Sequence, residues 1–149
     1  MKLIPLSQEK YAKVDDEDFS RVNQFKWCYT RSHGASYRRH GKGMMMHRFI
    51  LDAPKYLEVD HINGDHTDNR RSNLRFCTHA ENMRNSKMRR GNKTGYKGVY
   101  LNGRRWAARL QFNGKTIHFG QFNTKEEAAE AYNKGAKIYF GEFARLNEL

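Results

Sequence analysis

The sequence has no apolar run near the roughly 20 residues that a membrane-spanning helix needs. Its start, MKLIPLSQEK, lacks the long apolar core of a signal peptide. Only two cysteines are present, Cys28 and Cys77, which excludes a disulfide-dense secreted scaffold. There is also no Gly-rich phosphate loop, so no nucleotide cofactor is expected. These absences predict a cytoplasmic protein that binds neither membranes nor a small-molecule substrate.

Acidic residues are missing from two long stretches of the chain. Residues 82–125 contain eleven Lys or Arg and no Asp or Glu, and residues 19–51 contain seven Lys or Arg and again no acid. The formal net charge is +12. An ordinary solvated surface intersperses both signs of charge, whereas acid-free basic stretches are typical of proteins that bind a polyanion. The pattern favours nucleic acid as the partner.

At 149 residues the chain can form one ordinary domain or two small ones. The patterns predict an α+β protein in four parts. An N-terminal segment, residues 1–57, packs on a small polar unit at 58–86. A basic linker follows at 87–95, and a separate unit occupies 96–149.

The N-terminal segment has mixed patterns. Residues 3–6 read as a short strand, and the acids before Phe19 suit the first turn of a helix. Residues 26–30 and 35–39 predict two further strands. The apolar stretch 44–51 fits a strand or a helix equally well. Cys28 and Cys77 are predicted to be core residues.

The C-terminal unit alternates apolar and polar residues across 105–112, which predicts a half-buried strand. Asn113-Gly114 then signals a hairpin turn, and residues 115–119 continue the alternation. With a first strand at 96–101, this gives a three-stranded antiparallel sheet. Thr124 and Glu127 form a capping-box pattern that opens a helix behind the sheet. The outer face of the sheet is expected to carry Lys97, Arg105, Arg109, Gln111, Lys115, Thr116 and His118.

The densest polar cluster lies at 58–86 and predicts two short strands, an Asp/Asn-rich loop between them, and a helix. This unit could bring Asp60, His61, Asn73 and Asn82 around one small site. Histidine can accept a proton at neutral pH. Carboxylate and amide oxygens suit Mg²⁺, with Mn²⁺ as an alternative. Asn73 could either hold the His61 ring or brace the loop. Such groups are what phosphodiester hydrolysis needs.

This cluster resembles the HNH nuclease motif of phage and intron homing endonucleases, in the version with a final Asn. The matching segments are residues 59–64 (VDHING), 68–75 (DNRRSNLR) and 81–85 (ENMRN), and the opening segment matches at 4–6 (IPL), 14–18 (VDDED) and 46–48 (MHR). The resemblance implies a ββα-metal fold, His61 as general base, Asp60 and Asn82 as ligands of one divalent metal, and Asn73 as support for His61. No zinc is expected, because the chain has no CxxC pair.

The C-terminal unit resembles the plant ethylene-response-factor (APETALA-type) DNA-binding domain. The matching segments are 96–99 (YKGV), 106–108 (WAA), 119–122 (FGQF), 126–132 (EEAAEAY) and 144–147 (ARLN). The resemblance implies that the outer sheet face contacts double-stranded DNA. Tyr100, Gln111, Thr116 and His118 stand where that family usually has Arg or Trp, so the plant target sequence does not carry over.

The resulting prediction is a site-specific DNA endonuclease, monomeric with a dimer as the alternative, in a bacterial or phage-infected cell. Two alternatives stay open: a non-catalytic DNA-binding regulator on a decayed nuclease fold, and an RNA-binding protein. His47 is equally consistent with packing and with a phosphate contact. Further DNA contacts are predicted at Arg84, Arg89, Arg90 and Lys93.

Overall fold

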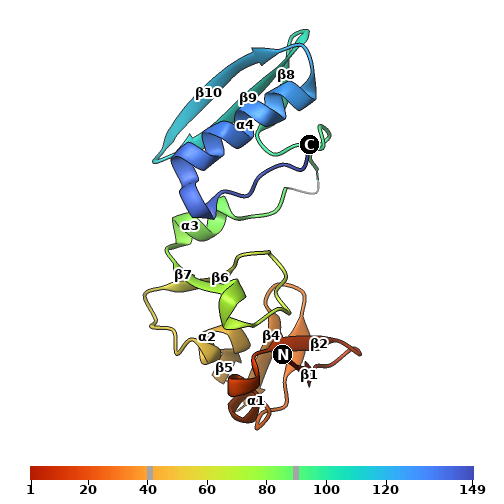
Figure 1. Cartoon of the computed structure of the whole chain (residues 1–149), viewed down its shortest axis with the longest axis vertical. Coiled ribbons are helices and arrows are strands. Elements are labelled where there is room, and N and C mark those ends of the chain that lie inside the picture. Colours follow the sequence, from red (N-terminus) through yellow and green to blue (C-terminus); the bar gives the residue numbers. More distant parts are fainter. Residues whose placement is uncertain (40–41, 89–90) are drawn as a thin grey trace. The chain divides into compact units, whose positions relative to one another are not determined.

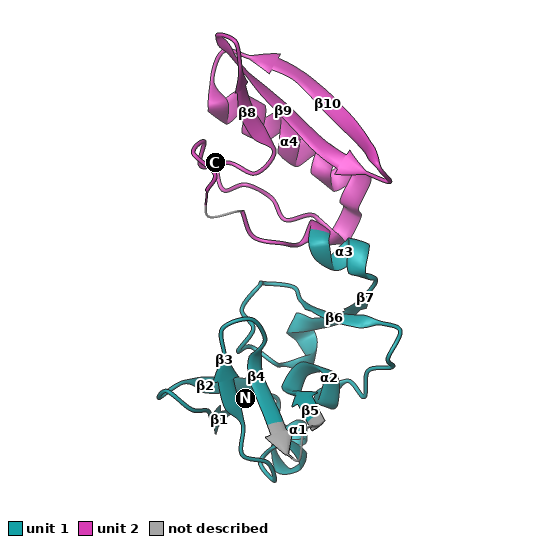
Figure 2. Ribbon diagram, turned by 180° about the vertical axis from the view of Figure 1, so that it is seen from behind, with its two compact units in different colours: residues 1–83 teal, residues 84–149 magenta. Residues whose placement is uncertain are grey.

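The computed structural model describes residues 1–39, 42–88 and 91–149, which form two compact units, Met1–Met83 and Arg84–Leu149. The element order is shown in Figure 1 and the two units in Figure 2. The class is mixed α+β with several small antiparallel sheets, as the sequence predicts. No helix in the described part of the chain is long and apolar enough to cross a membrane.

The first unit begins with an antiparallel hairpin of β1 (Lys2–Pro5) and β2 (Tyr11–Val14), followed by α1 (Asp16–Val22). Three acidic residues occupy the first turn of α1, where their negative charges interact favourably with the positive end of the helix dipole. A three-stranded antiparallel sheet follows, formed by β3 (Cys28–Thr30), β4 (Gly34–Arg39) and β5 (Lys42–Met45). The predicted strands at 3–6, 26–30 and 35–39 are therefore confirmed with shifted ends.

The ambiguous stretch 44–51 is both a strand and a helix. β5 ends at Met45, and α2 (Met46–Ile50) begins at the next residue. Met46 and Ile50 are one helical turn apart and fully buried, so the helical half of the stretch supplies the core.

Trp27 is at the centre of the core of the first unit. Its ring is almost fully buried, and its Nε1 donates a 2.8 Å hydrogen bond to the carbonyl of Val22. Phe25, Tyr37 and Phe49 pack around it in edge-on and tilted contacts. Cys77 is buried as predicted, but Cys28 is exposed. The prediction of Cys28 as a core residue is wrong, because Cys28 begins β3 on the solvent-exposed side.

The last part of the first unit is strand, loop, strand and helix, in the predicted order. β6 (Glu58–His61) pairs antiparallel with β7 (Leu74–Cys77), and a short 3₁₀ turn, η1 (Arg71–Asn73), leads into β7. Then α3 (His79–Arg84) follows and reaches the division between the two units (Figure 2).

The second unit contains the predicted three-stranded antiparallel sheet. Its strands are β8 (Val99–Asn102), β9 (Arg105–Phe112) and β10 (Lys115–Phe122), in the order β10-β9-β8. The helix α4 (Lys125–Phe140) lies against the sheet, and the turn η2 (Gly141–Phe143) follows it (Figure 1). The first strand begins at Val99 rather than at the predicted residue 96.

Small residues allow α4 to pack closely on the sheet. The capping box of Thr124 and Glu127 begins the helix as predicted, with both of its hydrogen bonds present. A Cβ at Gly135 would lie 2.1 Å from the Phe119 ring, and one at Gly98 would lie 2.2 Å from the Tyr132 ring. Both positions therefore require glycine, and Gly98 also has a positive φ of 75°.

Candidate active site

The strand–loop–strand–helix segment carries the four polar residues singled out in the sequence, and each has its own side-chain partner. The β6–β7 register places Asp60 opposite Arg75 and His61 opposite Leu74. Thr78 and Glu81 form a capping box. The Thr78 backbone N–H donates to Glu81 Oε2 at 2.8 Å, and the Glu81 N–H donates to Thr78 Oγ1 at 3.3 Å. This cap begins α3 at His79 and positions Asn82 on the helix.

The loop between β6 and β7 is held by backbone hydrogen bonds to β2. The Lys13 N–H donates to the carbonyl of Thr67, and the Asn69 N–H donates to the carbonyl of Lys13, both at 2.8 Å. The Asp68 side chain is buried and accepts two hydrogen bonds from the Arg70 guanidinium, at 2.7 and 2.6 Å. These contacts make the loop a fixed part of the site.

His61 lies at the end of β6 and is 5% exposed. Its Nε2 lies 3.3 Å from the side-chain oxygen of Asn69, which is fully buried. Burial lowers the pKa of His61 below its usual value of 6.5, although the hydrogen bond to the Asn69 oxygen acts in the opposite direction. A neutral imidazole at neutral pH is the form that a general base needs.

Two roles were predicted for Asn73, holding the His61 ring or bracing the loop, and its contacts within the loop fit the second. Asn73 Oδ1 accepts the Asn63 backbone N–H at 3.0 Å, and Asn73 Nδ2 donates to Asn63 Oδ1 and to the carbonyl of Asp68. Asn73 therefore braces the loop, while Asn69 contacts the His61 ring. Sequence reasoning missed Asn69, although its position in the DNRRSNLR segment was visible.

Two further histidine rings lie beside His61. The His47 ring, from α2, meets it edge-on with centroids 4.9 Å apart, and the His66 ring lies 5.3 Å away. His47 is 7% exposed, and its Nδ1 has no hydrogen-bond partner among the residues that the structure describes. Burial, followed by the charges of His61 and Arg48, lowers the pKa of His47 to about 3. The sequence is equally consistent with packing and with a phosphate contact for His47, and its burial favours packing.

The burial of His47 predicts a loss of stability in mild acid. In the unfolded chain His47 binds its proton near pH 6.5, whereas in the folded chain it does so near pH 3. The unfolded state therefore binds more protons between these values, and stability present above pH 6.5 is lost as the pH falls. We expect the free energy of unfolding to be about 2 kcal/mol lower at pH 5 than at pH 7 through this residue.

Urea unfolding at the two pH values measures this loss, and the difference should shrink in His47→Gln. An equal pH dependence in the variant would contradict the assignment to His47.

Asp60 is buried at 6% exposure and is paired with Arg75 on the neighbouring strand. Arg75 Nε and Nη2 donate to the same carboxylate oxygen, Oδ2, at 2.9 and 2.7 Å. This pairing compensates for the burial of the carboxylate.

Asn82 projects from α3 onto Glu58 of β6. Its Nδ2 donates to Glu58 Oε2 at 2.6 Å, and Glu58 Oε1 lies 2.8 Å from His79 Nδ1. The hydrogen bonds from Asn82 and then from His79 lower the pKa of Glu58. Glu58 and Asp60 are two positions apart on one strand and therefore lie on the same face of β6, which is the face that Asn82 approaches.

The side-chain oxygens of Asp60 and Asn82 are of the kind that a hard divalent ion binds. Mg²⁺ is typically bound by one or two protein oxygens and keeps several waters, and Asp60 and Asn82 can each supply one oxygen. Within residues 1–39, 42–88 and 91–149, no group of three or more His, Cys, Asp or Glu could hold a metal. The Cys77 thiol stays protonated at neutral pH, because burial raises its pKa to about 11.

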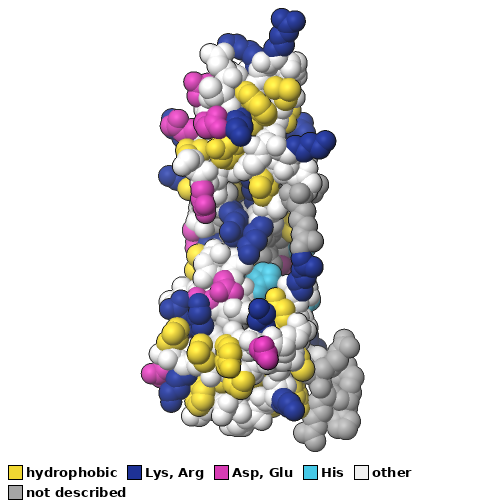
Figure 3. Space-filling view, turned by 90° about the vertical axis from the view of Figure 1, so that its right-hand side faces the viewer, with side chains coloured by type: hydrophobic (Ala, Val, Ile, Leu, Met, Phe, Trp, Pro, Cys, Tyr) yellow, Lys and Arg dark blue, Asp and Glu magenta, His cyan; other side chains and the backbone are white. Residues whose placement is uncertain are grey.

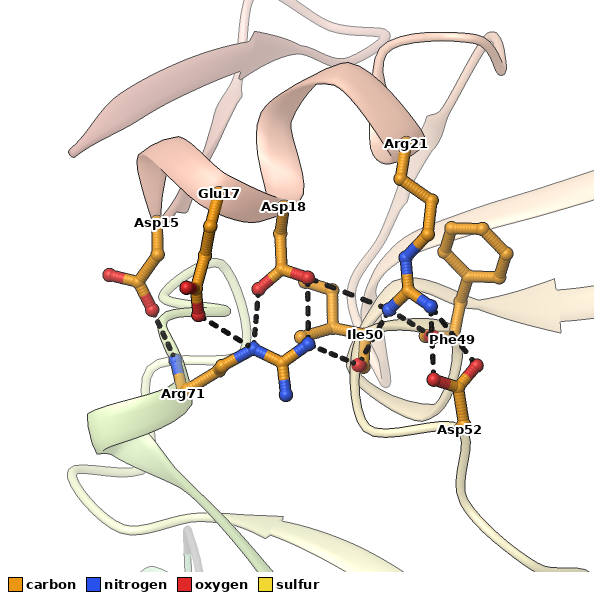
Figure 4. Close-up of polar contacts among 8 residues, drawn as sticks. All are labelled: Asp15, Glu17, Asp18, Arg21, Phe49, Ile50, Asp52 and Arg71. Carbon is orange, nitrogen blue, oxygen red and sulfur yellow. Dashed lines mark hydrogen bonds and ion pairs between the residues drawn. The ribbon is translucent and has the colours of Figure 1, made fainter.

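An ion-pair network around the buried carboxylate of Asp18 fixes the same loop to the N-terminal helices (Figure 4). Asp18 of α1 is 3% exposed and accepts hydrogen bonds from Arg71 Nε and Nη2, both at 2.8 Å. Arg71 also donates to the carbonyl of Ile50 at the end of α2, and Arg21 joins Asp18 to Asp52. One arginine of the loop thus contacts both α1 and α2.

Six of the seven residues predicted for the outer sheet face are exposed on β9 and β10: Arg105, Arg109, Gln111, Lys115, Thr116 and His118. The Arg109 guanidinium lies 4.6 Å over the Tyr100 ring, and the Tyr100 hydroxyl lies 3.4 Å from His118 Nδ1. Lys and Arg side chains are distributed over the face of the molecule drawn in Figure 3.

Lys97 is the exception. It precedes β8, and its Nζ donates to the carbonyls of Arg84 and Ser86 at 2.7 and 2.8 Å. Burial lowers its pKa to about 8. The prediction that Lys97 lies on the sheet face is therefore wrong, because the lysine binds the carbonyls at the end of α3 instead.

The other predicted basic contacts have separate environments. The Arg84 guanidinium lies over the Phe112 and Phe140 rings, at 5.0 and 5.4 Å. Lys93 is exposed. Arg89 and Arg90 lie outside the described residues. Within the predicted linker, Asn92 Oδ1 accepts from the backbone N–H groups of Thr94 and Gly95, so this part forms an ordered turn.

Comparison with known proteins gives two relatives. The family model for HNH endonucleases matches residues 52–84. A protein of Acanthamoeba polyphaga mimivirus named as an uncharacterized HNH endonuclease is 34% identical over 146 residues, covering 93% of this chain and 75% of that protein. Protein 3.8 of Escherichia phage T7 is 29% identical over 118 residues, covering 74% of this chain and 97% of that protein. No solved structure matches.

Proposed function

Because the chain belongs to the HNH endonuclease family, and is therefore a DNA-cleaving hydrolase, we propose that it is a site-specific endonuclease of the homing type. The proposed site is formed by β6, β7 and α3. The observation that carries it is the position of His61: a buried imidazole with a lowered pKa, next in sequence to the carboxylate of Asp60.

In the proposed reaction, His61 removes a proton from a water molecule as the water oxygen attacks the phosphorus in line. The bond from phosphorus to the 3′ oxygen breaks, and a 5′ phosphate is formed. Asn69 holds the His61 ring, and Asn73 keeps the loop in place through Asn63 and Asp68. A divalent ion bound by Asp60 and Asn82, Mg²⁺ or alternatively Mn²⁺, would stabilise the charge on the phosphate and on the leaving oxygen.

The second unit is proposed to bind the double-stranded target. This proposal is supported by its exposed basic and polar face on β9 and β10, and by its resemblance to the plant ethylene-response-factor domain. Two strands can enter the major groove, where Arg and Gln side chains distinguish base pairs. The second unit then holds the DNA while the site in the first unit cleaves one strand at a time. The protein is proposed to act as a monomer.

The proposal is tested with supercoiled DNA that contains the cognate site, incubated with the full chain and Mg²⁺. We expect nicked circles with Mg²⁺ or Mn²⁺ and none with EDTA. Binding should weaken steeply as salt rises, since phosphate contacts release counterions. If Arg109 contacts a phosphate, Arg109→Ala should reduce the slope of log affinity against log salt by about 1.

Lys137→Ala is the matched control for Arg109, because it removes a positive charge from α4 rather than from the sheet face. Cleavage that persists without divalent metal would contradict the metal-dependent mechanism. Equal salt slopes for wild type, Arg109→Ala and Lys137→Ala would argue against a phosphate contact at Arg109.

A further inference from the structure

We propose that Glu58 is a positioning residue for the metal site, which fixes the side-chain amide of Asn82 so that its oxygen faces the ion. This inference rests on the proposed function, in which Asn82 is a metal ligand. Asn82 projects from a short helix, and its amide has two chemically different ends. Only the oxygen can bind a cation, so the orientation of the amide determines whether Asn82 can act as a ligand.

The contact between Asn82 and Glu58 selects one orientation. An ionised carboxylate only accepts hydrogen bonds, so the nitrogen of the amide must face Glu58. The 2.6 Å distance between Asn82 Nδ2 and Glu58 Oε2 is that of a short, charge-assisted hydrogen bond. The amide oxygen is consequently directed away from Glu58, and in the proposed site it binds the ion.

Glu58 is itself held in place. Its second oxygen, Oε1, lies 2.8 Å from His79 Nδ1, and His79 is the first residue of α3. The two contacts of Glu58 therefore reach two positions of the same helix, three residues apart on one face. Because Glu58 and Asp60 share a face of the strand, the carboxylate that orients Asn82 is two residues from the other proposed ligand.

Without Glu58 the amide would lose its defined orientation. The terminal torsion of asparagine is broad and roughly two-fold, so the oxygen and nitrogen ends could exchange places. Groups that orient metal ligands typically affect affinity by 10–100-fold when they are removed. We therefore expect Glu58→Ala to weaken Mn²⁺ binding by about 10–100-fold.

Mn²⁺ binding to the full chain can be followed without cleavage, from the electron paramagnetic resonance signal of free Mn²⁺. Glu58→Gln is the matched comparison variant for Glu58→Ala. The glutamine lacks the charge but keeps an oxygen that can accept from Asn82 Nδ2, while its nitrogen can donate to His79. Retained binding in Glu58→Gln, together with the loss in Glu58→Ala, supports a positioning role. Equal losses in both variants overturn it, because they would reflect only the lost charge.

Two further variants separate this inference from the proposed function. Glu130→Ala removes an exposed carboxylate from the second unit and should bind Mn²⁺ like wild type. If Asn82→Ala binds Mn²⁺ like wild type, Asn82 is not a ligand, and both proposals fail. If Asn82→Ala weakens binding and Glu58→Ala does not, only the role of Glu58 fails. Thermal melting without metal should show each variant folded.

Discussion

Replacing His61 by alanine is expected to lower the rate of DNA cleavage by about 10²–10⁴-fold, the contribution typical of a positioned general base. The imidazole is held against Asn69 at the end of β6, and alanine has no group that can accept the proton of the attacking water. The affinity for DNA should change little, because the exposed face of β9 and β10 is untouched. Single-turnover cleavage and equilibrium binding on the same DNA measure the two quantities.

His118→Ala is the contrasting histidine variant. His118 lies on β10 beside the Tyr100 hydroxyl, within the proposed DNA-binding face. Its loss should weaken DNA binding and leave the cleavage rate of bound DNA unchanged, the reverse of the His61 result. If His61→Ala cleaved bound DNA as fast as wild type, His61 could not be the general base.

Replacing Arg71 by alanine is expected to lower the free energy of unfolding of the first unit by about 1–3 kcal/mol, the usual cost of leaving a buried acceptor without its hydrogen bonds. The substitution removes both 2.8 Å hydrogen bonds to Asp18, whose carboxylate is 3% exposed and would remain buried. Arg21 approaches Asp18 only at 3.5 Å and cannot replace these bonds. The carbonyl of Ile50 also loses a donor.

This loss can be measured by urea unfolding in a Trp106→Phe background, in which Trp27 reports on the first unit alone. Lys134→Ala provides the control, because it breaks an exposed ion pair with Glu130 on α4, which is worth about 0.3–0.5 kcal/mol. A change of less than about 1 kcal/mol in Arg71→Ala would mean that the network does not hold α1 and α2 to the loop.

The elements that the sequence predicted well are those with a local cause. The capping box of Thr124 and Glu127 begins α4 because both of its hydrogen bonds lie within one turn. The alternation across residues 105–112 predicted β9 because successive side chains of a strand point to opposite faces. The stretch 44–51 could not be assigned from the strand period or the helix period, because it contains both the end of a strand and a helix.

The site residues were harder to assign because their roles depend on contacts across the fold. Asn69 and Asn73 are both asparagines in one loop, and only the folded loop determines which of them reaches the His61 ring. Lys97 fits the pattern of a strand residue, yet the carbonyls of Arg84 and Ser86 attract its ammonium group. Neither the contact of Asn69 nor those of Lys97 produce a periodic pattern in the sequence from which they could be predicted.

The environment of Arg84 has a consequence for protein engineering. A chimera made by exchanging C-terminal units would naturally be joined within residues 87–95, where the sequence is rich in Gly, Asn and Lys. Arg84 packs on Phe112 and Phe140, and Lys97 binds the carbonyls of residues 84 and 86. A graft joined within 87–95 would leave Arg84 behind with the nuclease. The transplanted unit would then carry two aromatic rings without the guanidinium that packs on them, and a lysine without its acceptors. A junction between Met83 and Arg84 keeps these contacts within a single parent.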